Sequence, residues 1–157
     1  DAVVRQRIEE YAYCTQAEKD AIYRWLDTVE DTGTCLQGDY HTGNVIVTDD
    51  QALFIDMGDF AYGNPLFDIG CLYFCCMLNN AQAMDEYFHN TPENLKAFWS
   101  AFAKHYFGAE DGQALREVNE RVEPFAALTC IHFSNRNPYM SDETRSCVRE
   151  LLIDKIR

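Results

Sequence analysis

Hydrophobic positions recur at helical spacing over residues 3–14, and again in the stretch that follows Thr15. Thr15 and Glu18, three residues later, have the capping-box pattern with which helices begin. Gly33 is typical of the end of such a helix. The N-terminal part of the chain is therefore predicted to form two helices.

The period of the pattern changes at Cys35, from which short apolar runs broken by polar turns continue to Gly63. Two of these runs, at 45–47 and 52–55, flank the polar stretch 48–51. Apolar runs separated by so short a polar stretch are typical of a β-hairpin. We therefore predict a hairpin with a four-residue loop in this part of the chain.

Helical patterns resume after Pro65. Residues 66–78 are apolar on nearly every side, as in a helix that is buried all round. The pattern as a whole predicts an α+β fold that is predominantly α, in a single domain over 1–157. The other helices are predicted over 93–107, behind an N-cap at Thr91 with Pro92 in the first turn; over 110–133, kinked at Pro124; and from Ser141 to the C-terminus.

Composition and charge narrow the classes of partner. The 157 residues hold 13 Lys and Arg against 26 Asp and Glu, a net charge of −13, so the surface repels the phosphates of nucleic acids. The longest apolar stretch, 69–78, is about half of a membrane-spanning helix, so no membrane association is expected. Seven cysteines without a C-x-x-C pair, and an N-terminus without a signal-peptide pattern, predict a cytoplasmic protein with reduced thiols.

The β insertion carries the residues best suited to chemistry. Asp39 is followed by Asn44 five residues later, by the hairpin, and by Asp56 in an Asp-x-Gly turn, which is the order of the kinase catalytic loop and metal-binding turn. Phosphoryl transfer needs a carboxylate that orients and deprotonates the acceptor hydroxyl, and oxygen ligands for the Mg²⁺ on the nucleotide phosphates. Because Mg²⁺ keeps several waters, one carboxylate and one amide suffice.

Three motifs resemble the aminoglycoside phosphotransferase and choline kinase-like family. They are GDYHTGN at 38–44, IDMGD at 55–59 and GNPLFDI at 63–69. The family pattern is close to H-G-D-h-H-x-x-N, I-D-F-G-D and G-D-P-x-x-D-h, where h is hydrophobic. This sequence departs from that pattern at Gln37, Met57 and Asn64, and none of these changes removes a group that handles charge.

The resemblance implies the fold of a protein kinase-like C-terminal lobe, in which a small β-hairpin carries the catalytic and metal-binding loops. It implies that Asp39 is the catalytic base and that Asn44 and Asp56 are the Mg²⁺ ligands. The other implied roles are contacts to phosphate or substrate by His41 and Asp59, and structural support of the catalytic loop by Gln37, Gly38 and Asp68.

The activity implied by the resemblance is that of an ATP- and Mg²⁺-dependent small-molecule kinase. Its acceptor is a hydroxyl of a small molecule such as an aminoglycoside, choline or an amino sugar. The cationic substrates of the family and the charge of −13 both favour a cationic acceptor, although acidic proteins are common and a neutral acceptor stays open.

Kinases of this class grip the nucleotide phosphates with an N-terminal lobe, and no pattern for its sheet precedes Asp39. We therefore expect residues 1–157 to be the C-terminal catalytic lobe, without the N-terminal nucleotide-binding lobe and inactive alone. The surface that meets the missing lobe is expected to be apolar and able to pair two copies as a dimer.

Two alternatives stay open beside this interpretation. One is a degenerate or protein kinase-like domain that binds a nucleotide or a partner without turnover. The other is a non-enzymatic helical interaction domain that keeps only the fold. The intact set of Asp39, Asn44 and Asp56 argues against both.

Overall fold

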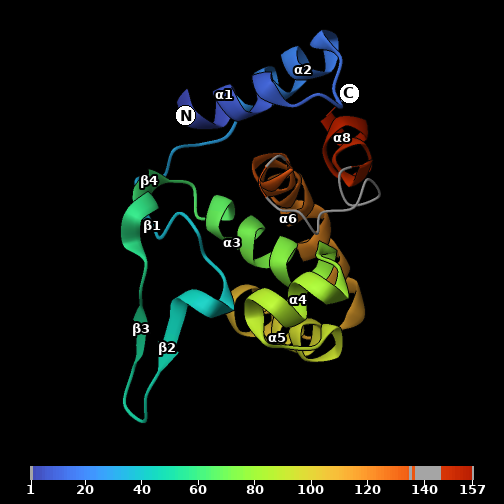
Figure 1. Cartoon of the computed structure of the whole chain (residues 1–157). Coiled ribbons are helices and arrows are strands. Elements are labelled where there is room, and N and C mark those ends of the chain that lie inside the picture. Colours follow the sequence, from blue (N-terminus) through green and yellow to red (C-terminus); the bar gives the residue numbers. More distant parts are fainter. Residues whose placement is uncertain (1, 135, 137–145, 157) are drawn as a thin grey trace.

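Helices form most of the protein (Figure 1). The computed structural model describes residues 2–134, 136 and 146–156. None of the described helices is long and apolar enough to cross a membrane. The helices are α1 (Ala2–Glu10), α2 (Gln16–Leu26), α3 (Leu66–Tyr73), α4 (Ala81–Phe88), α5 (Pro92–Phe107), α6 (Gly112–Phe133) and α8 (Asp154–Ile156), with π-helical turns at Phe74–Leu78 after α3 and at Arg149–Ile153 before α8.

Two small antiparallel sheets lie between α2 and α3 in the chain. In the first, β1 pairs with β4 and Thr34 stands opposite Gly63; in the second, β2 pairs with β3 and Val45 stands opposite Phe54. The β2–β3 hairpin projects away from the helices (Figure 1). The strands and 3₁₀ turns are β1 (Thr34–Leu36), η1 (Thr42–Asn44), β2 (Val45–Val47), β3 (Ala52–Phe54), η2 (Met57–Asp59) and β4 (Ala61–Gly63).

The predicted class, α+β and mainly α, is confirmed by these elements. Several predicted helix caps and the predicted hairpin are also present at the expected residues. Thr15 caps α2 in a capping box with Glu18. Thr91 caps α5, which has Pro92 in its first turn and ends before Gly108. The predicted hairpin is β2–β3.

The first two helices are shorter than predicted. α1 ends at Glu10 rather than at residue 14, and α2 ends at Leu26, well before Gly33. The side chain of Lys19 in α2 donates a hydrogen bond to the backbone carbonyl of Glu9, so α2 satisfies an end carbonyl of α1 and the chain can turn there. Packing of the two helices therefore sets this boundary.

Other differences from the prediction concern elements with weak sequence signals. The sequence pattern did not predict α4, although Asn80 caps it through a hydrogen bond from the Ala83 N–H. The β1–β4 pair was not predicted either, because strands of three residues hold too little alternation. Pro124 lies inside α6 as expected. The predicted cap at Ser141 lies outside the described residues.

The core is built around α3, which packs against α6. A Cβ atom on Gly70 of α3 would lie 2.6 Å from the backbone carbonyl carbon of Phe125 in α6, so only glycine permits this approach. Trp99 of α5 is fully buried, and its indole N–H donates to Asn119 Oδ1 at 2.9 Å. The Trp99 and Tyr73 rings are nearly perpendicular, with centroids 4.9 Å apart. α3 is thus fixed on two sides, and its first turn carries Asp68.

Candidate active site

The loop that begins the candidate site is attached to α3 through Asp68. The Oδ2 atom of Asp68 accepts a hydrogen bond from the Gln37 N–H at 2.7 Å, and Oδ1 accepts one from the Gly38 N–H at 3.0 Å. Burial raises the pKa of Asp68, the two N–H groups act against this rise, and the neighbouring charge of Asp39 adds to it. The start of the loop therefore takes its position from the helical core.

Gln37 connects this loop to the turn that carries Asp56. Its side chain is buried, and Nε2 donates to the carbonyls of Ile55 at 3.1 Å and Asp56 at 2.9 Å. Its Oε1 accepts from the Asp39 N–H at 2.7 Å. Both amide hydrogens and the amide oxygen are therefore used, and one side chain holds the backbone on either side of the site.

Gly38 allows the two loops to meet backbone to backbone. Its φ is +91°, a left-handed conformation that favours glycine. A Cβ atom at this position would lie 2.1 Å from the carbonyl oxygen of Asp59. Glycine is therefore required at residue 38 both by the backbone conformation and by the space available.

The Asp39 carboxylate is surrounded by three donors. Asn44 Nδ2 donates to the Asp39 backbone carbonyl at 2.9 Å and lies 3.4 Å from Oδ2, while His41 Nε2 lies 3.5 Å from Oδ2. The Cys71 thiol of α3 contacts Oδ1 at 3.8 Å. His41 is the main cause that lowers the pKa of Asp39, although burial opposes it. Asp39 is therefore ionised at neutral pH, as a proton acceptor must be.

The orientation of His41 is set by its own loop. Its Nδ1 accepts a hydrogen bond from the Gly43 N–H at 3.1 Å, so this tautomer carries its ring hydrogen on Nε2, the nitrogen that faces Asp39. The ring also packs against Phe88 of α4, with centroids 5.1 Å apart. His41 can therefore donate a hydrogen bond toward the Asp39 carboxylate.

Asn44 and Asp56 lie on adjacent segments. The Asn44 carbonyl accepts from the Ile55 N–H at 3.0 Å, which brings the residue before Asp56 against Asn44. Asn44 is buried and both of its side-chain hydrogen bonds use Nδ2, so Oδ1 has no hydrogen-bond partner among the described residues. Asp56 has φ +52° and ψ +60°, an uncommon conformation for a residue other than glycine, and such strain is frequent at functional sites.

The donor types of these two side chains are those that magnesium prefers. An amide oxygen and a carboxylate are hard ligands, and Mg²⁺ retains several waters when few protein ligands bind it. Across residues 2–134, 136 and 146–156, no three or more His, Cys, Asp or Glu side chains gather as a metal site. A magnesium ion held by Asn44 and Asp56 would therefore need water and ligand oxygens to complete its coordination.

The structure brings the predicted site residues together in one region. They are Gln37, Gly38, Asp39, His41 and Asn44 in the loop, Asp56 and Asp59 in the following turn, and Asp68 in α3.

Four further residues in this region were not identified from the sequence. Cys71 contacts Asp39, and the charges of Asp39 and Asp59 act on His132, which in turn lies in the field of Arg7 and Arg136. Since they come from α1, α3 and the end of α6, no local motif could have joined them to the loop.

The comparison with known proteins agrees with the motifs. The phosphotransferase enzyme family matches residues 3–120, a range that includes the whole loop at 37–44 and the Asp56 turn. Neither a curated protein nor a solved structure matches the chain.

Replacing Gly38 by alanine tests the contact between the two loops. Gly38→Ala must accommodate both the positive φ and a Cβ against Asp59, whereas Gly108→Ala has a φ of +74° with nothing within 4 Å of the new Cβ. We expect Gly108→Ala to lower the free energy of unfolding by about 1–2 kcal/mol. Gly38→Ala should cost about 1–3 kcal/mol more, because the Cβ overpacks the backbone. Urea denaturation of both variants measures the difference, and equal losses would contradict the close approach.

A second prediction concerns the effect of His41 on Asp39. In His41→Asn the new side chain can still accept from the Gly43 N–H but cannot reach Asp39. The His41 hydrogen bond lowers the pKa of Asp39, so its loss should raise that pKa. On acidification, Asp39 should then become protonated at a higher pH than in the wild-type protein. Carboxyl ¹³C NMR titration of Asp39 measures this shift.

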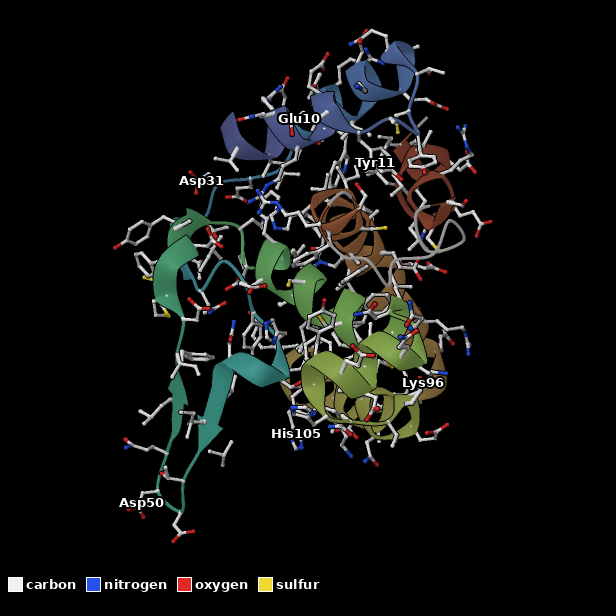
Figure 2. All side chains as sticks on the ribbon, viewed as in Figure 1. Glu10, Tyr11, Asp31, Asp50, Lys96 and His105 are labelled. Atoms are coloured by element: carbon white, nitrogen blue, oxygen red, sulfur yellow. The ribbon has the colours of Figure 1, made fainter. Side chains whose placement is uncertain are left out.

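His105→Asn is the control, since His105 lies on the outside of α5 (Figure 2). The pKa of Asp39 should be the same in this variant as in the wild-type protein. An unchanged pKa in His41→Asn would show that His41 does not control the ionisation of Asp39.

Proposed function

The chain belongs to the phosphotransferase enzyme family, and from this membership we propose that it transfers the γ-phosphoryl group of ATP to a hydroxyl of a small molecule, with Mg²⁺ as cofactor. One observation carries the proposal. Gln37 holds two backbone segments together. One segment carries the ionised Asp39 carboxylate and the free amide oxygen of Asn44, and the other carries the Asp56 carboxylate. Phosphoryl transfer requires this set of a base and oxygen ligands.

Asp39 acts as the base in the proposed reaction. The acceptor oxygen forms a bond to the γ-phosphorus, the bond from that phosphorus to the bridging oxygen breaks, and ADP leaves with the electron pair. The acceptor hydroxyl loses its proton to an Asp39 carboxylate oxygen. Asn44, His41 and Cys71 all contact this carboxylate and would keep it in one orientation for the acceptor.

Asn44 Oδ1 and the Asp56 carboxylate would hold the magnesium ion. When bound, Mg²⁺ neutralises charge on the nucleotide phosphates. The Asn44 amide is suited to this role because its nitrogen is already bonded to Asp39, which directs the oxygen elsewhere. His41 and Asp59 stay candidates for contacts to the phosphoryl group or the acceptor.

The proposal includes a second lobe that grips the nucleotide. Large apolar side chains are exposed along the two sheets and the Asp56 turn, which is typical of an interaction surface. We propose that a nucleotide-binding lobe covers this surface, and that two copies associate through it when the lobe is absent. The exposed residues are Ile46, Val47, Leu53, Phe54, Ile55, Met57, Phe60 and Tyr62.

The proposal also includes a location. Each of the seven cysteines is a free thiol, as is common in a reducing compartment. An ATP-dependent enzyme of this kind is expected in the cytoplasm.

Replacing the proposed base gives the direct test of function. In the protein expressed from its complete reading frame, Asp39→Asn should lower kcat for ATP-dependent phosphorylation by about 10²–10⁴-fold, because the amide cannot accept the hydroxyl proton. Nucleotide binding should be retained. The control is Asp50→Asn, since Asp50 lies at the tip of the hairpin away from the helices (Figure 2), and its kcat should equal that of the wild type.

The assay follows ADP release and phosphorylated product over a panel of hydroxyl compounds. Near-normal turnover in Asp39→Asn would remove Asp39 from the mechanism. Mg·ATP binding without transfer to any acceptor would favour a degenerate nucleotide-binding domain instead.

A further inference from the structure

A cavity of about 650 Å³ opens between α2, α6 and α8, and none of the residues that line it belongs to the candidate active site. Small-molecule pockets typically measure about 300–1,000 Å³. Asn64, where the sequence departs from the family pattern, also lines the cavity. Its Nδ2 donates to the Glu30 carbonyl at 3.1 Å, and its Oδ1 accepts from the Leu66 N–H at 3.0 Å. The cavity therefore adjoins the start of α3.

Aromatic rings form part of the cavity wall. Trp25 of α2 and Phe125 of α6 both line it, with ring centroids 5.2 Å apart and ring planes at 64°. Phe125 is buried, whereas Trp25 is only partly buried, so Trp25 is the ring that a ligand can reach. Because aromatic rings pack well against one another in edge and offset arrangements, this wall favours a ligand that carries an aromatic ring.

The wall also holds a hydrogen-bond donor and an acceptor that can serve a ligand. The Trp25 indole N–H makes no hydrogen bond to the residues that the structure describes. Pro124 has no N–H, so the Glu120 carbonyl four residues earlier lacks the donor that a helix normally supplies. Pro124 and Glu120 both line the cavity. A ligand with an N–H or O–H group can therefore bond to the Glu120 carbonyl.

The charge of the wall differs from that of the chain. Acidic residues outnumber basic ones by 26 to 13 in the sequence, but three basic and two acidic residues line the cavity. Lys155 is paired with Glu123. The Arg121 guanidinium lies 5.9 Å from the ring centroid of Phe107, a contact that leaves its N–H groups available. The five charged residues of the wall are Arg24, Arg121, Lys155, Glu30 and Glu120.

The two arginines of the wall are suited to an anion. Among the residues that the structure describes, neither Arg24 nor Arg121 forms an ion pair with the two carboxylates of the wall. A guanidinium binds a carboxylate through paired hydrogen bonds, and the Trp25 N–H adds a third donor of the kind that an anion needs.

We infer that this cavity is a second binding site, whose ligand is a small aromatic carboxylate that also carries an N–H or O–H group. The ring of the ligand packs against Trp25. Its carboxylate binds Arg24 and Arg121, and its N–H or O–H group donates to the Glu120 carbonyl. The inference is independent of the proposed function, because Asp39 is not part of this site.

Isothermal titration calorimetry on the purified protein, without nucleotide, tests the class of ligand. The probe is indole-3-acetate, and three relatives each change one feature: tryptamine reverses the charge, indole-3-acetamide removes it, and naphthalene-1-acetate removes the N–H. Indole-3-acetate should bind at least about tenfold more tightly than tryptamine or the acetamide, as expected for hydrogen bonds to a charged group. Naphthalene-1-acetate should bind about two- to tenfold more weakly, as expected for the loss of one neutral hydrogen bond.

The two tryptophans of the chain make the location of the ligand measurable. Trp25 lines the cavity, whereas Trp99 is fully buried with its indole N–H bonded to Asn119. In ¹H–¹⁵N NMR spectra, indole-3-acetate should shift the indole N–H signal of Trp25 and leave that of Trp99 in place. Trp25→Phe assigns the two signals. A shift of the Trp99 signal alone, or of neither signal, would contradict the inferred location.

Arg24→Gln and Arg121→Gln should each weaken the binding of indole-3-acetate by about three- to tenfold. Arg116→Gln is the matched control, because it removes the same charge from an exposed position of α6 outside the cavity wall, and its affinity should equal that of the wild type. Pro124→Ala supplies the missing N–H to the Glu120 carbonyl, so it should remove the preference for indole-3-acetate over naphthalene-1-acetate. Thermal melts check that each variant is folded.

The inference is overturned if indole-3-acetate does not bind, or if tryptamine or the acetamide binds as tightly. An affinity for indole-3-acetate that is unchanged in both Arg24→Gln and Arg121→Gln would also overturn it. The proposed function fails separately, because none of these measurements contains ATP. Asp39→Asn should lower phosphoryl transfer and leave the binding of indole-3-acetate unchanged.

Discussion

The Asp68 carboxylate accepts two backbone hydrogen bonds, from Gln37 and Gly38, and the rest of the candidate site is built outward from them. A half-buried carboxylate is costly unless donors meet it, and N–H groups that bond to a charge are strong donors. Asp68 in turn is fixed because α3 lies against α6, at a distance that Gly70 permits. The helical core therefore determines where Gln37 lies. Gln37 then holds Asp39 on one side and Asp56 on the other.

Much of the site could be predicted from the sequence because its residues lie in short motifs. Asp39, Asn44 and Asp56 are recognisable by type and spacing, and the local signals at Thr15, at Thr91 and around the hairpin act through neighbouring backbone atoms. Such signals need no knowledge of the rest of the fold. The ends of α1 and α2, in contrast, depend on how the two helices pack, so periodicity misplaced them.

The parts that could not be predicted depend on distant segments. The charges of Arg7 on α1 and of Arg136 after α6 both act on His132, and neither arginine stands in a motif. Cys71 has the appearance of a core residue, and its contact with Asp39 exists only because α3 passes behind the loop. These contacts are therefore properties of the tertiary structure.

Amide hydrogen exchange in Asp68→Asn tests most directly the claim that α3 positions the loop that carries Asp39. The asparagine keeps the size of the side chain but turns an NH₂ group toward one of the two N–H donors. The account predicts that exchange at Gln37, Gly38 and Asp39 becomes about tenfold faster or more, as expected for the loss of a charge-assisted hydrogen bond. Exchange at Thr48, whose N–H bonds to Gln51 within the hairpin, should not change. Unchanged rates at Gln37 and Gly38 would show that the loop holds its position without Asp68, and would contradict the account.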